Sequence, residues 1–254
     1  MKKILLTIAY DGSGYCGYQL QGELPTVSLM LNASAEKTFG FPCNVTGCSR
    51  TDSGVHALGF CATVEPRDKE NEITVPVAKV PIAMNVNLPP DISVLSAKEV
   101  REDFHPRYDV VKKEYVYRIH ASRVKDPFSH KLALEYGREI SDESFEKMTQ
   151  GAQFFIGTHY FDAFMSVGSQ IENTERTVYD AHLERNGEFV EFYVSANGFL
   201  YNMVRIMVGT LLSIDSGRIE PDEIPKIIES RDRARAGFTA RPDGLFLKKV
   251  YYNS

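Results

Sequence analysis

Several features that place proteins in special classes are absent from this chain of 254 residues. Its four cysteines, Cys16, Cys43, Cys48 and Cys61, form no Cys-x-x-Cys pair and lack the dense spacing of a secreted disulfide scaffold. We expect reduced, buried thiols. Cys43 and Cys48 lie upstream of His56 and Cys61, but the second half of a zinc motif is missing, so no metal site is predicted.

The sequence also lacks a targeting or membrane-spanning segment. The apolar run at residues 4–10 is short and ends in Asp11-Gly12 without a small-residue cleavage site. The longest weakly charged stretch, residues 192–214, contains Arg205 and changes its periodicity midway. We therefore expect a cytoplasmic protein with no membrane partner.

The chain as a whole has no excess of positive charge. Its 34 Asp and Glu residues outnumber its 29 Lys and Arg residues, which gives a net charge of -5. This balance argues against a protein that coats nucleic acid indiscriminately, and DNA is not an expected partner. Residues 101–125 carry seven basic against four acidic side chains, and residues 226–249 carry seven against three. The two segments indicate either a basic surface for a polyanion or charges scattered in solvent.

The hydrophobic pattern predicts an α+β protein with mainly antiparallel sheet. Alternation indicates strands at residues 4–10, 60–64, 92–100, 111–119 and 245–252. Helical spacing follows Thr26 and ends at Gly40, and it recurs after Ser141, over residues 199–213 and from 221 to about 230. Strands at residues 177–183 and 189–196 flank an Asn186-Gly187 pair, a strong hairpin signal.

One loop, residues 47–57, concentrates polar groups in the sequence Gly-Cys-Ser-Arg-Thr-Asp-Ser-Gly-Val-His-Ala. Such loops often carry function, although Asp52 could simply turn over Gly54 and pair with Arg50. Arg205 interrupts a long uncharged helix, so it either seeks a carboxylate or reaches past the apolar stripe to water or a neighbouring strand. If Arg205 serves only to pair with a carboxylate, Arg205→Met should leave the free energy of unfolding unchanged or raise it.

The loop at residues 47–57 resembles the catalytic motif of the TruA family of tRNA pseudouridine synthases, in which an aspartate follows Arg-Thr and precedes Gly-Val-His. Other family landmarks occur in the family's order over residues 4–252. They are Tyr10-Asp11-Gly12 with Gly17 and Gln19, Asn85 to Asp91, Phe104-His105, Lys113 to Tyr117, Gly157 to Phe161, Arg176-Thr177, the helix of residues 199–209, and Gly244-Leu245. Tyr18 departs from the family, which usually has Trp there.

The resemblance implies that the chain isomerises uridine to pseudouridine without a cofactor. Asp52 matches the catalytic aspartate and acts as nucleophile on the sugar or as a base; the sequence does not choose between them. Arg205 would pair with Asp52, Tyr115 would stack on the uracil and help remove the C5 proton, and Leu245 would pack on the base.

The reactive uridine must be flipped out of a stem, which requires cationic contacts with the RNA backbone. We assign substrate binding to basic side chains and to the imidazole of the catalytic loop, namely Arg50, His56, Arg107, Lys112, Lys113 and the basic residues of 231–241.

The family fold consists of two mixed, mainly antiparallel sheet halves with flanking helices, facing each other across a basic cleft. We place the halves at residues 1–105 and 106–254. The resemblance further implies a homodimer acting on tRNA positions 38 to 40, in the anticodon stem-loop. Two alternatives stay open, a paralogue acting on another RNA such as ribosomal RNA and a non-catalytic RNA-binding or RNA-folding protein.

Overall fold

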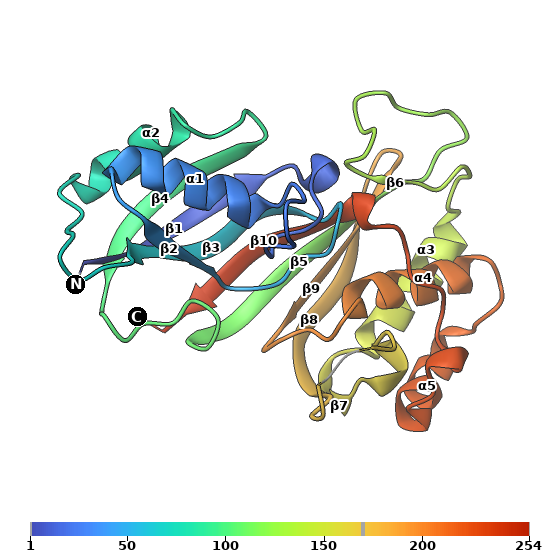
Figure 1. Cartoon of the computed structure of the whole chain (residues 1–254). Helices are drawn as coiled ribbons and strands as arrows, with labels where there is room; N and C mark the ends of the chain where they lie inside the picture. The colour runs from blue at the N-terminus through green and yellow to red at the C-terminus, as the bar shows by residue number, and fades with distance from the viewer. Residues whose placement is uncertain (1, 169–170, 254) are drawn as a thin grey trace. The chain divides into compact units, whose positions relative to one another are not determined.

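The computed structural model describes residues 2–168 and 171–253, which form ten β-strands and five α-helices. This confirms the α+β class. The chain divides into two compact units, Met1–Val111 with Phe246–Ser254, and Lys112–Leu245 (Figure 1). The expected halves were residues 1–105 and 106–254. The observed division lies a few residues later, and residues 246–254, with most of the last strand, belong to the first unit.

The first unit is built on a mainly antiparallel sheet. Its strands lie in the order β4-β1-β3-β10, with β2 paired to β3, and only the β3–β10 pair is parallel. Their bounds are β1 Lys3–Tyr10, β2 Cys43–Gly47, β3 His56–Pro66, β4 Ile92–Val100 and β10 Leu245–Tyr252. Every residue of β3 except Leu58 and Glu65 is buried, so this strand forms the centre of the unit's core.

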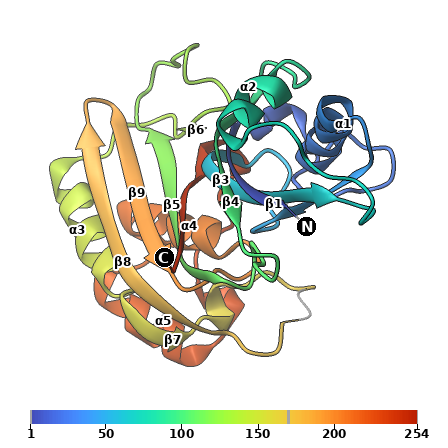
Figure 2. The same ribbon diagram turned by 90° about the vertical axis from the view of Figure 1, so that its left-hand side faces the viewer.

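Two helices lie side by side against these strands, α1 (Val27–Phe39) and α2 (Val80–Asn85) (Figures 1 and 2). The Thr26 hydroxyl accepts the Leu29 N–H at 3.3 Å, and Gly40 ends α1 in the left-handed conformation, as the sequence predicted. The sequence did not predict α2, which lies in a proline-rich stretch. Pro81 is tolerated there because it occupies the first turn.

The second unit contains the antiparallel order β5-β9-β8-β7, with the short β6 parallel to β5. The bounds are β5 Val110–His120, β6 Leu134–Glu135, β7 Gly157–Tyr160, β8 Glu175–Asn186 and β9 Phe189–Ala196. The predicted β8–β9 hairpin is confirmed, although β8 continues through Asn186 and the turn is made by Gly187 and Glu188. Gly187 has a φ of 59°, which explains a glycine at this place.

Three helices complete the second unit, α3 (Asp142–Gln153), α4 (Met203–Asp215) and α5 (Ile224–Ser230). α3 lies against β8 and beside α4 (Figure 2). The expected start of α4 at Phe199 is wrong by four residues, because Asn202 adopts a left-handed conformation just before the helix. α4 is buried on nearly all sides, with Arg205 and Asp215 as its two partly exposed residues.

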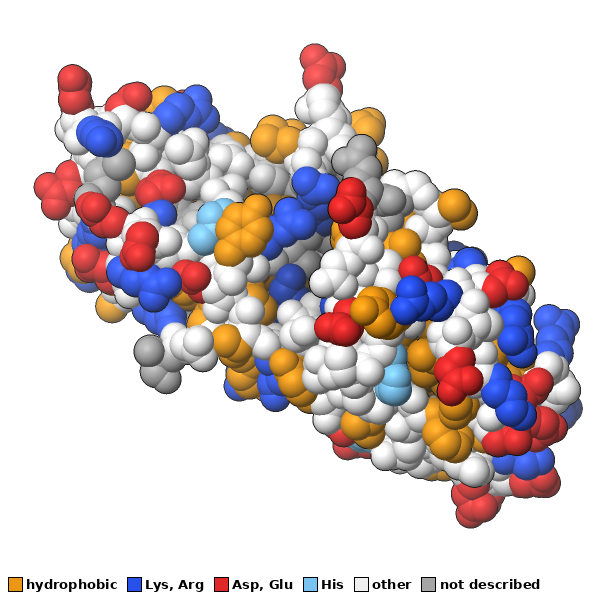
Figure 3. All heavy atoms as spheres, turned by 90° about the horizontal axis from the view of Figure 1, so that it is seen from below, with side chains coloured by type: hydrophobic (Ala, Val, Ile, Leu, Met, Phe, Trp, Pro, Cys, Tyr) orange, Lys and Arg blue, Asp and Glu red, His pale blue; other side chains and the backbone are white. Residues whose placement is uncertain are grey.

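Charges of both signs are interspersed on the face of the molecule that Figure 3 shows. Among the described residues, no helix has the length and apolar character that crossing a membrane requires.

Candidate active site

The catalytic-loop candidate joins β2 to β3 and carries a half-buried Asp52. The Val55 N–H donates to the Asp52 carbonyl at 3.1 Å and closes a tight turn. Gly54, the third residue of this turn, has a φ of 79°, the conformation that favours glycine. Arg50 is exposed and makes no hydrogen bond or ion pair within residues 2–168 and 171–253, so the structure does not show the local pairing of Arg50 with Asp52.

The residue before Asp52 is held by the segment of residues 10–18. Thr51 is buried, its carbonyl accepts the Tyr18 N–H at 3.1 Å, and its hydroxyl lies 2.9 Å from the Tyr10 hydroxyl. A backbone and a side-chain hydrogen bond therefore fix the chain immediately before Asp52.

The residues after Asp52 are held by Tyr15 of the same segment. The Tyr15 carbonyl accepts the Ser53 hydroxyl at 3.1 Å and the Gly54 N–H at 3.4 Å. The Tyr15 hydroxyl donates to Asp91 Oδ1 at 2.7 Å. Asp91 also accepts the Asp11 N–H through its carbonyl at 2.9 Å. Two landmarks far apart in the sequence thus act together to hold the catalytic loop.

Two glycines allow the segment of residues 10–18 to approach the loop closely. A Cβ on Gly12 would lie 2.0 Å from the Val55 carbonyl oxygen, and one on Gly17 would lie 2.5 Å from the Thr51 carbonyl oxygen. Gly17 also has a φ of 84°. Any side chain at either position would push the catalytic loop away.

His56, which follows the loop, is fully buried and stacks on Phe246 with ring centroids 4.5 Å apart. Its Nδ1 accepts the Gly12 N–H at 3.0 Å, so the 3.1 Å approach of Asp11 Oδ1 to the same atom is not an ion pair. Partial burial by itself raises the pKa of Asp11, but hydrogen bonds from the Ser13 hydroxyl and N–H lower that pKa below its usual value. The structure gives His56 a packing and positioning role, and its predicted contact with substrate stays a prediction.

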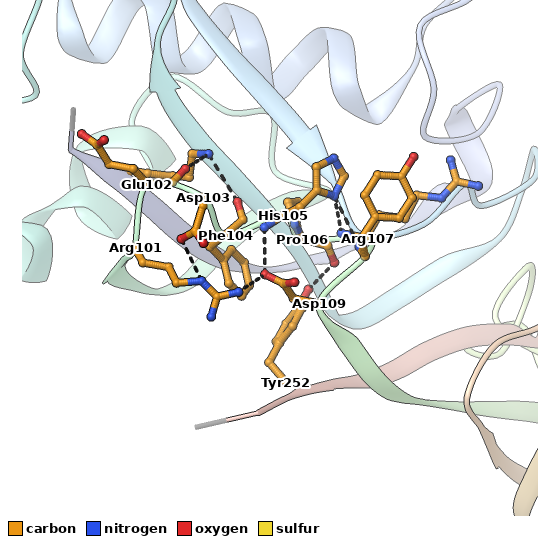
Figure 4. A network of polar contacts seen from close by, with 11 residues as sticks. Arg101, Glu102, Asp103, Phe104, His105, Pro106, Arg107, Asp109 and Tyr252 are labelled. Carbon is orange, nitrogen blue, oxygen red and sulfur yellow. Dashed lines mark hydrogen bonds and ion pairs between the residues drawn. The ribbon is translucent and has the colours of Figure 1, made fainter.

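Arg107 lies on a turn whose backbone is fixed by polar contacts (Figure 4). His105 Nδ1 accepts the N–H groups of Arg107 at 3.1 Å and Tyr108 at 3.3 Å. Asp109 Oδ2 accepts the His105 N–H at 3.0 Å and an Arg101 N–H at 2.7 Å. The Arg107 side chain is exposed and has no partner among the described residues, as a phosphate-binding group requires.

Residues near both ends of the chain hold the same turn in place. Lys3 Nζ donates to the Phe104 carbonyl at 3.3 Å, and the Tyr252 hydroxyl donates to the Pro106 carbonyl at 2.8 Å. The Phe104 and Tyr252 rings meet edge to face at 5.0 Å. Pro106 therefore provides the carbonyl for a partly buried anchor.

In the second unit, the two tyrosines of the Lys-x-Tyr-x-Tyr motif have different surroundings. Tyr117 is fully buried, and its hydroxyl donates to the Arg241 carbonyl at 2.6 Å. Burial raises the pKa of Tyr117 well above its usual value, although Arg205 opposes the rise. Tyr115 is buried to 7% exposure and meets the Phe199 ring edge to face at 5.0 Å. The Tyr117 hydroxyl therefore serves a structural contact, and the catalytic assignment of Tyr115 stays a prediction.

Arg205 has two partners in its own unit. Its Nε donates to the Ala240 carbonyl at 2.7 Å, and its Nη1 donates to Asn202 Oδ1 at 2.7 Å. The Ala240 N–H donates in turn to the Arg205 carbonyl at 3.1 Å. The guanidinium therefore tethers a neighbouring segment that is not a strand, and its pairing with Asp52 stays a prediction.

That segment, residues 237–245, follows α5 in the chain, passes beside Gly209 of α4 and ends at Leu245. Gly237 and Gly209 meet so closely that a Cβ on Gly209 would lie 1.8 Å from the Phe238 carbonyl oxygen. The Gly237 N–H donates to the Thr210 hydroxyl at 2.9 Å. Leu245 is buried to 6% exposure at the start of β10.

The predicted site residues are divided between the two units. Arg50, Asp52, His56 and Arg107 lie in the first unit. Those of the second unit are Lys112 and Lys113, both half-buried on β5, with Tyr115, Arg205 and Leu245. The meeting of the two groups, and with it the basic cleft, stays a prediction. Among the described residues, no group of three or more His, Cys, Asp or Glu is placed to hold a metal ion.

Sequence reasoning missed Tyr15 and gave Asp91 no role. Asp91 was part of a family landmark, but Tyr15 lies between Gly14 and Gly17 with nothing to mark its hydroxyl. The short spacing of glycines 12, 14 and 17 was the available signal, since it favours a tight segment lying close to another backbone.

Known proteins are similar in sequence to this chain over nearly its whole length. A family model described as tRNA pseudouridine synthase matches residues 152–253. Proteins named tRNA pseudouridine synthase A from Thermoanaerobacter sp. and Acetivibrio thermocellus are 40% and 41% identical, each over 99% of this chain and 100% of the relative. One named tRNA pseudouridine synthase A 2 from Clostridium perfringens is 38% identical over the same shares. A chain of a Cbf5-Nop10-Gar1 complex covers 82% of this chain and 53% of its own at 13% identity, and its TM-score of 0.36 is too low to carry an argument.

Proposed function

Because this chain belongs to the tRNA pseudouridine synthase A family, we propose that it converts uridine to pseudouridine in the anticodon stem-loop of tRNA, at positions 38 to 40. Family membership rests on relatives about 40% identical over nearly the whole chain, and it makes the protein an isomerase that forms pseudouridine in tRNA. The position within tRNA comes from the resemblance of the motifs. The observation that carries the catalytic proposal is the tight Asp52 turn, held on both sides by residues 10–18.

The reaction breaks the bond between C1′ and N1 of uridine, turns the uracil and joins C1′ to C5. The proton on C5 is lost and N1 gains one, so atoms and charge balance without an oxidant, a reductant or an energy source. Asp52 provides the carboxylate, either by bonding to the sugar or by taking a sugar proton. The fixed turn supports both routes, because it limits how far the carboxylate can move between free and bound states.

The buried groups of the second unit provide a surface for the base and a partner for the carboxylate. Tyr115 offers an aromatic ring for stacking and a hydroxyl near C5, and Leu245 offers an apolar contact. Arg205 is held at Nε by the Ala240 carbonyl and at Nη1 by Asn202, and we propose that its guanidinium also pairs with Asp52.

Binding of the RNA backbone is assigned to the cationic side chains. Arg50 and Arg107 are exposed on ordered loops, and Lys112 and Lys113 are half-buried on β5. We include His56 as the residue that keeps the end of the catalytic loop in place. We further propose a homodimer that acts in the cytoplasm, both on the resemblance to the family.

The direct test measures product and position together. Purified protein is incubated with a tRNA transcript containing 5-tritiated uridine, and released tritium is counted while pseudouridine is mapped by carbodiimide treatment and primer extension. We expect tritium release with signals at positions 38 to 40. Pseudouridine elsewhere in tRNA would contradict the position, and RNA binding without tritium release would contradict the catalytic proposal.

A further inference from the structure

The loop between β5 and β6, residues 121–133, stands away from the strands it connects (Figures 1 and 2). None of its residues belongs to the catalytic group, and the motifs described above assign it no role. The sequence of this loop is Ala-Ser-Arg-Val-Lys-Asp-Pro-Phe-Ser-His-Lys-Leu-Ala.

The tip of the loop is ordered by its own hydrogen bonds. Asp126 Oδ1 accepts the Phe128 N–H at 3.0 Å, and the Asp126 carbonyl accepts the Ser129 hydroxyl at 3.1 Å. The Leu132 N–H then donates to the Ser129 carbonyl at 2.8 Å. Pro127 further restricts the backbone between these contacts. The turn therefore presents Phe128 in a defined direction.

The base of the loop is anchored to two carboxylates. The Ser122 hydroxyl donates to Glu188 Oε1 at 2.7 Å, and the Ser129 hydroxyl oxygen lies 3.3 Å from Glu135 Oε1. Both carboxylates also approach the buried His120, at 3.0 Å for Glu135 and 3.6 Å for Glu188. These contacts bind the loop to β5, β6 and the β8–β9 turn.

Despite this order, the loop leaves its largest apolar groups in water. The Phe128 side chain is 90% exposed and Val124 is 75% exposed. A full aromatic ring exposed on an ordered turn forgoes the hydrophobic stabilisation that burial would give. The ring is therefore fully accessible to a partner that can stack on it.

The charges around the ring favour an anionic partner. Lys125 and Lys131 have no ion pair within the described part of the chain. Asp126 is the one acidic residue of the loop and accepts the Phe128 N–H through Oδ1, while Arg123 lies 3.7 Å from Glu139, so Lys125 and Lys131 still outnumber the acidic side chain beside the ring. A second copy of this loop would bring its own lysines against these, whereas a polyanion would complement them.

We propose that Phe128 is a stacking site for an unpaired nucleobase of the tRNA, with Lys125 and Lys131 contacting the adjacent phosphates. This inference rests on the proposed tRNA substrate and adds a contact outside the catalytic residues. Aromatic rings stack on bases without strong sequence preference, while neighbouring cations follow the backbone. The contact holds a nucleotide that is not base-paired, because a paired base does not present its face.

The test measures RNA affinity with turnover removed. In the Asp52→Asn protein, dissociation constants for an unmodified tRNA transcript and for a fully paired RNA duplex are measured by fluorescence anisotropy. Adding Phe128→Ala should raise the tRNA dissociation constant about 5- to 150-fold, as loss of one stacked base does. Phe128→Tyr keeps the ring and should stay within about twofold. Ile82→Ala, which removes an exposed apolar side chain on α2, is the matched control and should change nothing.

Two further arms identify the partner. Phe128→Ala should not weaken binding of the duplex or change the oligomeric state by sedimentation. Replacing Lys125 and Lys131 with Gln should lower the salt dependence of tRNA binding by roughly one to two units of slope. Unchanged tRNA affinity in Phe128→Ala, equal losses for tRNA and duplex, or a changed oligomeric state would overturn the proposal.

The outcome is separable from that of the proposed function. If the wild-type protein forms pseudouridine in tRNA while Phe128→Ala binds tRNA normally, the stacking site alone is refuted. If Phe128→Ala weakens tRNA binding while the wild-type protein forms no pseudouridine, the site stands and the catalytic proposal fails.

Discussion

The Tyr15 hydroxyl donates a 2.7 Å hydrogen bond to Asp91 while the Tyr15 carbonyl accepts two hydrogen bonds from the catalytic loop. One residue therefore connects the chain before β4 to the turn after Asp52. Tyr15 itself is buried to 7% exposure, so water does not readily replace its hydroxyl contact. The landmark of Asn85 to Asp91 therefore has a structural role, because Asp91 supports, through Tyr15, the loop that carries Asp52.

Tyr15→Phe should lower turnover by more than the accompanying loss of stability explains. Losing a hydrogen bond to a carboxylate costs about 1–3 kcal/mol in the free energy of unfolding. A displaced catalytic loop should reduce the single-turnover rate at saturating tRNA roughly 10- to 100-fold. Urea unfolding and rapid-quench rates measure the two effects. Tyr179→Phe, at a half-exposed tyrosine of β8, is the control and should change neither. A normal rate with lowered stability would leave Tyr15 a purely structural role.

Asp52→Asn should abolish pseudouridine formation while tRNA affinity changes little. The amide preserves the shape of the side chain but is neither a useful nucleophile nor a base, so a loss of about three orders of magnitude or more in rate is expected. Tritium release and filter binding on the same tRNA provide the comparison. Substantial residual release would remove Asp52 from its role.

Tyr18→Phe should stabilise the protein. The Tyr18 hydroxyl is buried without a hydrogen-bond partner among the described residues, and the ring stacks on Phe60 at 4.4 Å. Burial also raises the pKa of Tyr18 well above its usual value. Removing an unpaired buried hydroxyl keeps the packing and should raise the free energy of unfolding by about 1 kcal/mol. A loss of stability in urea unfolding would show that the hydroxyl has a partner, such as a buried water.

Local signals in the sequence were sufficient to predict several elements. Thr26 and Gly40 specified both ends of α1, because a hydroxyl caps the first turn and a glycine accepts the left-handed conformation. The Asn186-Gly187 pair specified the hairpin between β8 and β9 within one residue of the observed turn.

Long-range relationships could not be predicted in this way. Tyr15 and Asp91 are 76 positions apart, and no local pattern links a tyrosine in a glycine-rich turn to an aspartate after two prolines. The start of α4 was missed for a related reason. Asn202 leaves the helical conformation, and its amide binds both Arg205 and Ser166, which only the folded unit brings together.

The stability of the second unit should depend on pH through His120. Burial by itself lowers the pKa of this imidazole, but Glu135 and Glu188 outweigh it and raise the pKa above the usual value of 6.5. Protonated His120 therefore stabilises the folded state fully below pH 6.5, and this stabilisation is lost as pH rises through the folded pKa. The difference in unfolding free energy between wild type and His120→Asn should be larger at pH 6 than at pH 9. A difference that is constant or grows with pH would contradict the prediction.

Arg205 offers the sharpest separation of structural and catalytic roles. The sequence alone suggested that Arg205→Met would leave stability unchanged or raised. The structure changes that expectation, because Ala240 is fully buried and its carbonyl would lose the Arg205 Nε donor. Arg205→Met should therefore lower the free energy of unfolding by about 1–3 kcal/mol. Arg205→Lys keeps one charge but cannot reproduce the planar arrangement of Nε and Nη1, so a smaller loss is expected.

The matched control for Arg205 is Thr210→Val, which removes the hydroxyl that binds the Gly237 N–H and so loosens the same segment without touching the guanidinium. All three variants should lose stability, but only those at Arg205 should lose single-turnover rate sharply if the guanidinium pairs with Asp52. In Arg205→Met, the acid limb of the pH–rate profile should also move to higher pH, because a carboxylate without its cation is protonated more readily. If Thr210→Val loses rate in the same proportion to stability as the Arg205 variants, and the pH–rate profile does not move, the guanidinium only tethers residues 237–245 and the pairing hypothesis fails.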